Sequence, residues 1–123
     1  MASKTDDPLR MQHMIKFARK AIGFSARKSR ADLDKDELLC LALVRLIEMI
    51  GEAAARITTE SRDCHSEIPW AKIVGMRNRL VHGYDQVDLD LLWQTIERDL
   101  KPLVEQLEKI IPLNDPDQTT DES

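Results

Sequence analysis

The residue types in this chain that are best suited to chemistry lie close together, in the stretch MRNRLVHGY at positions 76–84. Arg77 is followed directly by Asn78, and His82 is followed two positions later by Tyr84. An arginine binds a phosphate through paired N–H groups, and a histidine moves a proton near neutral pH. These abilities are the ones that RNA cleavage through the neighbouring 2′-hydroxyl needs, and that reaction requires no metal ion.

Arg77 has an unusual place on the helix that the sequence predicts over residues 70–82. On a helical wheel it lies about 40° from Ile73, in the middle of an apolar arc. A buried guanidinium needs an acidic partner, an anionic ligand or a water-filled cleft. Glu48 or Glu52 could be that partner, so a structural ion pair is one interpretation and an anion-binding site is the other.

His82 raises a geometric question, because on a regular helix it lies about 140° from Arg77. The two side chains converge if the helix deforms before Gly83 or if Arg77 reaches around its neighbours. They also converge if two chains meet on a twofold axis and each supplies one arginine and one histidine. Gly83 is expected to end the helix, so His82 could instead be a capping residue alone. Asn78 lies four positions before His82, where two helical side chains can meet.

Basic residues flank this stretch. Lys72 and Arg79 lie on either side of Arg77, and no acidic residue occurs between Glu67 and Asp85. We therefore expect a local patch of cations that includes Lys72 and Arg79 and is suited to binding phosphate groups.

The charge of the whole chain is unevenly distributed. Residues 10–82 hold 14 Lys or Arg against 9 Asp or Glu, a net of +5, whereas residues 83–123 hold 3 against 11, a net of −8. A positive body with an acidic end is compatible with binding an anionic polymer. A soluble surface with a disordered acidic tail is the other explanation.

The apolar residues follow helical spacing and show no strand pattern. Asp7 with Pro8 predicts the start of the first helix and Asp88 that of the fourth, while Asp34 with Glu37 predicts the start of the second. Pro102 should kink the fourth helix. The predicted helices span residues 7–24, 34–58, 70–82 and 88 onward, with a loop at 59–69. We expect an all-α fold, an up-and-down bundle of four to five helices.

The helix predicted at 34–58 is apolar over most of its circumference and keeps a narrow polar stripe that includes Arg45, Glu48 and Glu52. So wide an apolar surface indicates several helical neighbours, or a partner chain as well.

The chain of 123 residues is expected to form one domain at 1–112, followed by a disordered acidic tail at 113–123. It holds no apolar run of the roughly 18 residues that a membrane span requires, and its first residues lack a signal peptide. Cys40 and Cys64 are too few and too isolated for a disulfide framework or a zinc site. We expect a cytoplasmic protein with no metal and no cofactor.

The stretch MRNRLVHGYDQVD resembles the signature of HEPN domains, specifically of the HepT-like family: an arginine, a polar residue, a short spacer, then histidine and, two positions later, tyrosine. The flanking stretches IGEAAARI at 50–57, IPWAKIVGMRNRLVHGY at 68–84 and LLWQTIERDLKPL at 91–103 agree with that family. The resemblance covers roughly residues 6–112.

The resemblance implies an all-helical HEPN domain that dimerises and forms a composite ribonuclease site from two such motifs. HepT-like proteins are typically toxins of toxin–antitoxin pairs, and their usual partner is a minimal nucleotidyltransferase that silences the toxin by transferring AMP to the motif tyrosine. Carried over here, His82 is the acid–base residue, Arg77 binds the phosphate and the transition state, Asn78 orients the site and Tyr84 accepts AMP. RNA is the implied substrate.

Two further interpretations remain open. The chain could be a non-catalytic helical partner of a nucleotidyltransferase, in which Arg77, His82 and Tyr84 form only a docking and modification surface. It could also be a structural dimer without chemistry, which leaves the central place of Arg77 unexplained.

Overall fold

The computed structural model describes residues 4–82 and 86–111, and of His82 only the backbone. A 3-10 turn at Lys4–Asp6 leads into the helices, which are α1 (Asp7–Ser25), α2 (Asp32–Lys35), α3 (Glu37–Ala55), α4 (Thr59–Cys64), α5 (Trp70–Leu80), α6 (Leu89–Gln94) and α7 (Leu100–Ile110). A π-helical turn at Thr95–Asp99 joins α6 to α7, and two-residue strands β1 (Val81–His82) and β2 (Gln86–Val87) follow α5. The predicted tail at 113–123 lies outside the described residues.

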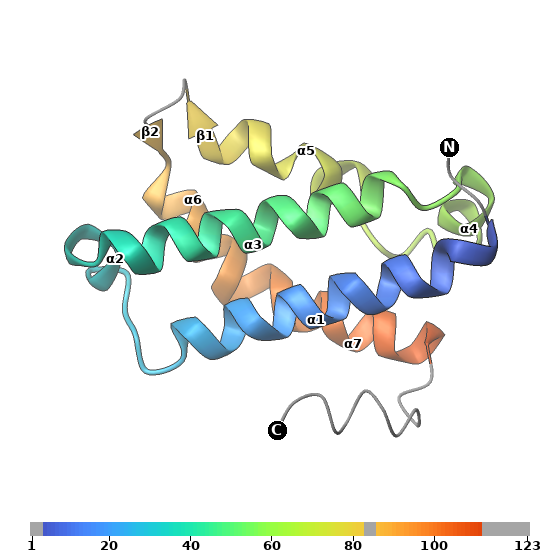
Figure 1. The fold of residues 1–123 in the computed structure, drawn as a ribbon, viewed down its shortest axis with the longest axis horizontal. Helices are drawn as coiled ribbons and strands as arrows, with labels where there is room; N and C mark the ends of the chain where they lie inside the picture. The colour runs from blue at the N-terminus through green and yellow to red at the C-terminus, as the bar shows by residue number, and fades with distance from the viewer. Residues whose placement is uncertain (1–3, 83–85, 112–123) are drawn as a thin grey trace.

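The long helices form an up-and-down bundle, as predicted. Figure 1 shows α1 and α3 side by side with opposite directions, α5 beyond α3, and α7 along α1. The core between them is built from aliphatic side chains and methionines, and its fully buried members include Met14, Leu43, Leu80, Leu92 and Leu107. The all-α fold class is therefore confirmed.

The second predicted helix begins and ends elsewhere. Its first residue is Glu37, because the Asp36 side chain accepts the backbone N–H of Leu39 at 3.0 Å, whereas Asp34 lies in the separate short helix α2. It ends at Ala55, and Thr58 then caps the next helix, α4, with its hydroxyl accepting the Ser61 N–H at 3.3 Å. Part of the loop predicted at 59–69 is thus helical.

The fourth predicted helix begins as expected and is interrupted before Pro102. The Asp88 side chain accepts the Leu91 N–H at 3.0 Å, which caps α6. The Leu100 N–H then bonds to the carbonyl of Thr95, five residues back, which defines the π turn. The ring of a helical proline clashes with the carbonyl four residues earlier, here that of Arg98, and the π turn contains this residue. Figure 1 shows the chain changing direction between α6 and α7.

The described part of the chain contains no helix that is both long and apolar enough to cross a membrane. Cys40 is buried and Cys64 is exposed, and both are free thiols.

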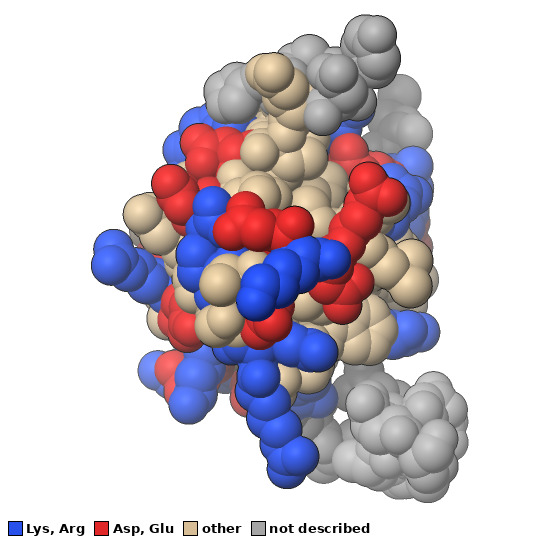
Figure 2. Space-filling model, turned by 90° about the vertical axis from the view of Figure 1, so that its left-hand side faces the viewer, with Lys and Arg blue, Asp and Glu red and all other residues tan. Residues whose placement is uncertain are grey.

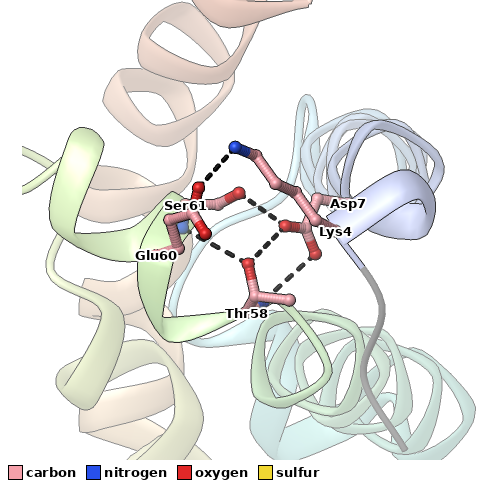
Figure 3. Close-up of polar contacts among 5 residues, drawn as sticks. All are labelled: Lys4, Asp7, Thr58, Glu60 and Ser61. Carbon is pink, nitrogen blue, oxygen red and sulfur yellow. Dashed lines mark hydrogen bonds and ion pairs between the residues drawn. The ribbon is translucent and has the colours of Figure 1, made fainter.

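Asp7 ties the start of α1 to the junction between α3 and α4. It is only 3% exposed, and its carboxylate accepts the Thr58 N–H at 3.1 Å, the Thr58 hydroxyl at 2.6 Å and the Ser61 hydroxyl (Figure 3). An ion pair between Lys4 and Glu60 lies beside it. Burial alone would raise the pKa of the Asp7 carboxyl, but the hydrogen bonds from Ser61 and Thr58 outweigh it and lower the pKa.

Replacement of Asp7 tests this contact. Asp7→Asn substitutes an amide donor for one of the accepting oxygens, so it should lower the free energy of unfolding by about 2 kcal/mol at pH 7. Because the folded-state pKa is depressed, the carboxylate stabilises the fold above its unfolded pKa of about 3.9, and this stabilisation is lost as the pH falls through the folded-state value. Urea denaturation should therefore show the difference between parent and variant narrowing below about pH 4.

The control is Asp6→Asn, because Asp6 is the exposed neighbour and makes no capping hydrogen bond. The account is wrong if Asp6→Asn costs as much as Asp7→Asn, or if the Asp7→Asn difference stays constant down to the acid transition.

Candidate functional site

The site begins with the close approach of α5 to α3. At Gly51 of α3, a β-carbon would lie 3.2 Å from the backbone oxygen of Ile73 in α5, which is tighter than ordinary packing. A glycine at this position therefore lets the two backbones lie close together. As a result, polar side chains on the adjoining edges of α3 and α5 come within hydrogen-bonding distance of each other.

Arg77 lies at the exposed edge of α5 and pairs with Glu48 of α3. Its Nε donates to Glu48 Oε2 at 2.6 Å, and the arginine side chain is 61% exposed, against 17% for the glutamate. The expectation that Arg77 occupies the middle of a buried face is wrong. The apolar arc of α5 is narrower than predicted, because Val74 is 36% exposed and the buried side holds Trp70, Met76 and Leu80.

Glu48 also lies near a second arginine. Arg45 Nη1 lies 3.6 Å from Glu48 Oε1 and 3.1 Å from Glu52 Oε2. Glu52 and Arg45 are both more than half exposed. The polar stripe of α3 and Arg77 of α5 therefore form one line of alternating charge, Glu52–Arg45–Glu48–Arg77. The sequence suggested Glu48 as a partner of Arg77, but Arg45 was not singled out, although its spacing from Glu48 is visible in the polar stripe.

His82 does not lie on the helix, contrary to prediction. α5 ends at Leu80, and Val81 and His82 form a strand that pairs with Gln86 and Val87, with His82 opposite Gln86. The Leu80 carbonyl accepts the Asp88 N–H at 2.7 Å, which closes the hairpin at its base. The regular-helix separation of about 140° between Arg77 and His82 therefore does not apply. The predicted cap Gly83 and the predicted AMP acceptor Tyr84 lie outside the described residues.

Asn78 is exposed on the last turn of α5. Since the helix stops at Leu80, the helical relation between Asn78 and His82 that the sequence predicted does not exist. The residues between them instead turn from helix into strand, so the motif spans a change of backbone structure.

The flanking cations lie on another side of α5. Lys72 and Arg79 are seven residues apart, so they lie within about 20° of each other on the helix and away from Arg77. Lys72 Nζ lies 3.4 Å from Asp99 Oδ2 of the π turn. Arg79 is exposed and has no ion pair within the described residues. The expected uniform patch of cations is thus partly neutralised by acidic residues from other elements.

A cavity of about 310 Å³ lies beside α5, between it, α3 and the start of α7. Its lining includes the apolar Ile73 and Met76 and the charged Lys72, Arg98 and Asp99. Arg77 and Asn78 do not line it, so the cavity and the motif occupy different sides of the helix.

Charges of both signs also mix at the end of the molecule that carries α2 and the start of α6. Figure 2 shows Lys and Arg side chains interspersed there with Asp and Glu side chains. Arg30, for example, lies 2.7 Å from Asp90 and 3.2 Å from Asp34. Among the described residues, no group of three or more His, Cys, Asp or Glu side chains could hold a metal ion.

Arg77 keeps hydrogen-bond donors that its ion pair with Glu48 leaves unused. Arg77 is held through Nε, so its two terminal nitrogens carry N–H groups that Glu48 does not engage. Arg77 and the backbone of His82 are joined by only four residues that leave the helix and enter the hairpin. An arginine that binds phosphate and a histidine that moves a proton would suffice for transfer at phosphorus.

Comparison with known proteins gives a family for the chain. The sequence model described as "Ribonuclease HepT-like" matches residues 14–110. "Putative RNase TTE0752" of Caldanaerobacter subterraneus is 40% identical over 80 residues, which cover 65% of this chain and 71% of that protein. "Probable ribonuclease HepT" of Thermococcus cleftensis is 36% identical over 80 residues, which cover 61% of this chain and 73% of that protein.

A third relative extends the match over nearly its full length. "Putative RNase MJ1380" of Methanocaldococcus jannaschii is 28% identical over 106 residues, which cover 86% of this chain and 97% of that protein. No solved structure matches the chain.

Proposed function

The chain belongs to the HepT-like ribonuclease family, and we propose that it is a metal-independent RNA endonuclease and the toxin of a toxin–antitoxin pair. The observation that carries the proposal is the sequence motif Arg77–Asn78–His82–Tyr84, whose Arg77 lies exposed on the last turn of α5 and pairs with Glu48. The names of three relatives as ribonucleases support the same reaction class.

In the proposed reaction the 2′-hydroxyl of RNA loses its proton to a base and its oxygen attacks the adjacent phosphorus. The 5′-oxygen leaves and takes up a proton from an acid, which yields a 2′,3′-cyclic phosphate and a 5′-hydroxyl. A histidine can serve as base or acid, and in a dimer the two copies of His82 can serve as one of each. Arg77 would neutralise the charge that builds up on the phosphate oxygens, and Asn78 would orient the site.

The first test is RNA cleavage in EDTA by protein expressed without a partner. Loss of the imidazole in His82→Ala should lower the rate by roughly 100-fold or more, because acid–base catalysis contributes about that much. His65→Ala is the control, since no hydrogen bond or ion pair of the His65 side chain is found among the described residues. If His82→Ala cleaved RNA as fast as the parent, the proposed nuclease site at His82 would be rejected. Absence of cleavage by the unmodified parent would favour a non-catalytic partner of a nucleotidyltransferase.

We further propose that two chains pair through the exposed side of α3 beside the motif. Leu38 and Leu41 are 79% and 57% exposed, and Val74 of α5 is 36% exposed. Leu41 and Arg45 are one helical turn apart, so this apolar surface continues into the charged line that ends at Arg77. Pairing of two copies there would bury the leucines and bring two motifs together.

The oligomeric state tests this surface. The parent should show twice the 14.1 kDa mass of one chain in light scattering, and Leu41→Glu should shift it to a single chain by placing a charge in the apolar contact. Because Leu41→Glu loses the dimer, its rate of RNA cleavage should also be lower than that of the parent. The matched control is Leu9→Glu on α1, where Leu9 is 47% exposed. A parent that is monomeric, or a Leu41→Glu variant that stays dimeric, would contradict the proposed interface.

The proposed regulation is transfer of AMP from ATP to the Tyr84 oxygen by a cognate minimal nucleotidyltransferase, with pyrophosphate as the leaving group. The product is a phosphodiester whose negative charge competes with RNA for Arg77 and whose bulk blocks the site. Tyr84 is the only tyrosine in the chain, so any AMP on a tyrosine must be attached there.

Co-expression with that partner tests the modification. Intact-mass spectrometry should show one or more added AMP units on the parent and none on Tyr84→Phe, which lacks only the acceptor oxygen. Tyr84→Phe should still cleave RNA, and the partner should no longer suppress it. AMP found on Tyr84→Phe would assign the modification to another residue and refute this step.

A further inference from the structure

We infer that Glu48 is a positioning residue for Arg77 and fixes the guanidinium in the orientation that binds the RNA phosphate. The inference rests on the proposed function and assigns to α3 a direct part in the site that α5 carries.

The contact engages one particular edge of the guanidinium. Glu48 Oε2 accepts the Nε–H of Arg77 at 2.6 Å, and within the described residues no other carboxylate lies in ion-pair range of Arg77. A guanidinium presents N–H groups on Nε and on its two terminal nitrogens, and two of them together match two phosphate oxygens. With Nε engaged by Glu48, the pair of terminal nitrogens remains for a phosphate.

Glu48 is held more firmly than the arginine it contacts. Its side chain is 17% exposed, against 61% for Arg77. Ile47 and Ile50 of the same helix are 3% and 2% exposed, so the backbone that carries Glu48 is anchored in the core. The second oxygen of Glu48 lies 3.6 Å from Arg45 Nη1, so the carboxylate also faces a second cation.

A free arginine on a helix surface samples many rotamers and loses that freedom when it binds a ligand. A carboxylate that holds it in advance removes this entropic cost from binding and catalysis. Glu48 also reduces the local positive charge, but its hydrogen bond to Nε leaves the terminal N–H groups of Arg77 available to a phosphate. The net effect that we infer is better placement at the expense of some electrostatic attraction.

The chain offers a matched control one helical turn away. Glu52 is 58% exposed, pairs with Arg45 at 3.1 Å and lies outside ion-pair range of Arg77. Glu48→Ala and Glu52→Ala each remove one carboxylate from the same stripe of α3 and introduce a strong helix former, so both variants should fold. Only Glu48→Ala removes the carboxylate that pairs with Arg77.

The experiment is a double-mutant cycle in which kcat/KM is measured for cleavage of a defined RNA in EDTA. Glu48→Ala should lower kcat/KM by roughly 10-fold, since small misplacement of a catalytic group costs up to about 100-fold. Glu48→Gln keeps an oxygen that accepts the Nε–H and should stay within about threefold of the parent. Glu52→Ala should leave the rate unchanged. Glu48→Ala combined with Arg77→Ala should be no slower than Arg77→Ala alone, because Glu48 acts only through Arg77.

Three results would overturn the inference: parental activity in Glu48→Ala, equal losses in Glu48→Gln and Glu48→Ala, or a loss that adds fully to that of Arg77→Ala. A role of Glu48 in stability alone predicts the additive result.

Binding separates this inference from the proposed function. A 2′-O-methyl RNA cannot be cleaved, because its attacking oxygen is blocked, and its Kd is measurable by fluorescence anisotropy even if the parent cuts no RNA. Glu48→Ala should weaken this binding several-fold in protein with Arg77 and leave it unchanged in Arg77→Ala protein. If the parent does not cleave RNA but this dependence is observed, the nuclease fails while the positioning role stands. If Glu48→Ala does not change the Kd in protein with Arg77, the positioning role fails.

Discussion

The burial of α3 on more than one side is the constraint on which the rest of the molecule depends. This helix packs against α1 and against α5, so most of its circumference is committed to the core. The α5 contact requires a residue without a side chain at Gly51, because a β-carbon there would press on the Ile73 carbonyl. Close packing of the two backbones in turn places Glu48 within 2.6 Å of Arg77. The fold thus sets the position of the arginine through a helix that is distant from it in sequence.

The end of α5 supplies the second constraint. The chain leaves the helix after Leu80, whose side chain is fully buried and whose carbonyl accepts the Asp88 N–H at 2.7 Å. Asp88 also caps α6 through its side chain. One short hairpin is therefore fixed at its base by a buried leucine and by the start of the next helix. The backbone of His82 lies on this hairpin, two residues beyond the end of α5 and five beyond Arg77.

The sequence predicted what depends on local spacing and missed what depends on contacts between elements. Helical periodicity identified the main helices, and the Asp88 cap marked the start of α6. Asp7 also marked the start of α1, but its predicted capping role is wrong, because its carboxylate accepts hydrogen bonds from Thr58 and Ser61 instead. The wheel placed Arg77 in a buried arc because it treated Val74 as buried, whereas Val74 lies at the exposed edge. The hairpin after Leu80 has no alternation long enough to predict, and Gly83 favoured a simple helix cap. The sequence offered Glu48 and Glu52 alike as partners of Arg77, and only the packing of α3 on α5 selects Glu48. The pairing of Lys72 with Asp99 was not predicted, because Asp99 comes from an element distant in sequence.

The central claim is that the motif at the end of α5 cleaves RNA by attack of the RNA's own 2′-hydroxyl on the adjacent phosphorus. The most direct test is the chemistry of the product ends, read by mass spectrometry after digestion in EDTA of one RNA and of the same RNA with a single 2′-deoxy residue at the cut. The account predicts a 2′,3′-cyclic phosphate and a 5′-hydroxyl from the first substrate and an uncut bond in the second. A 5′-phosphate with a 3′-hydroxyl, or cleavage at the 2′-deoxy position, would contradict it.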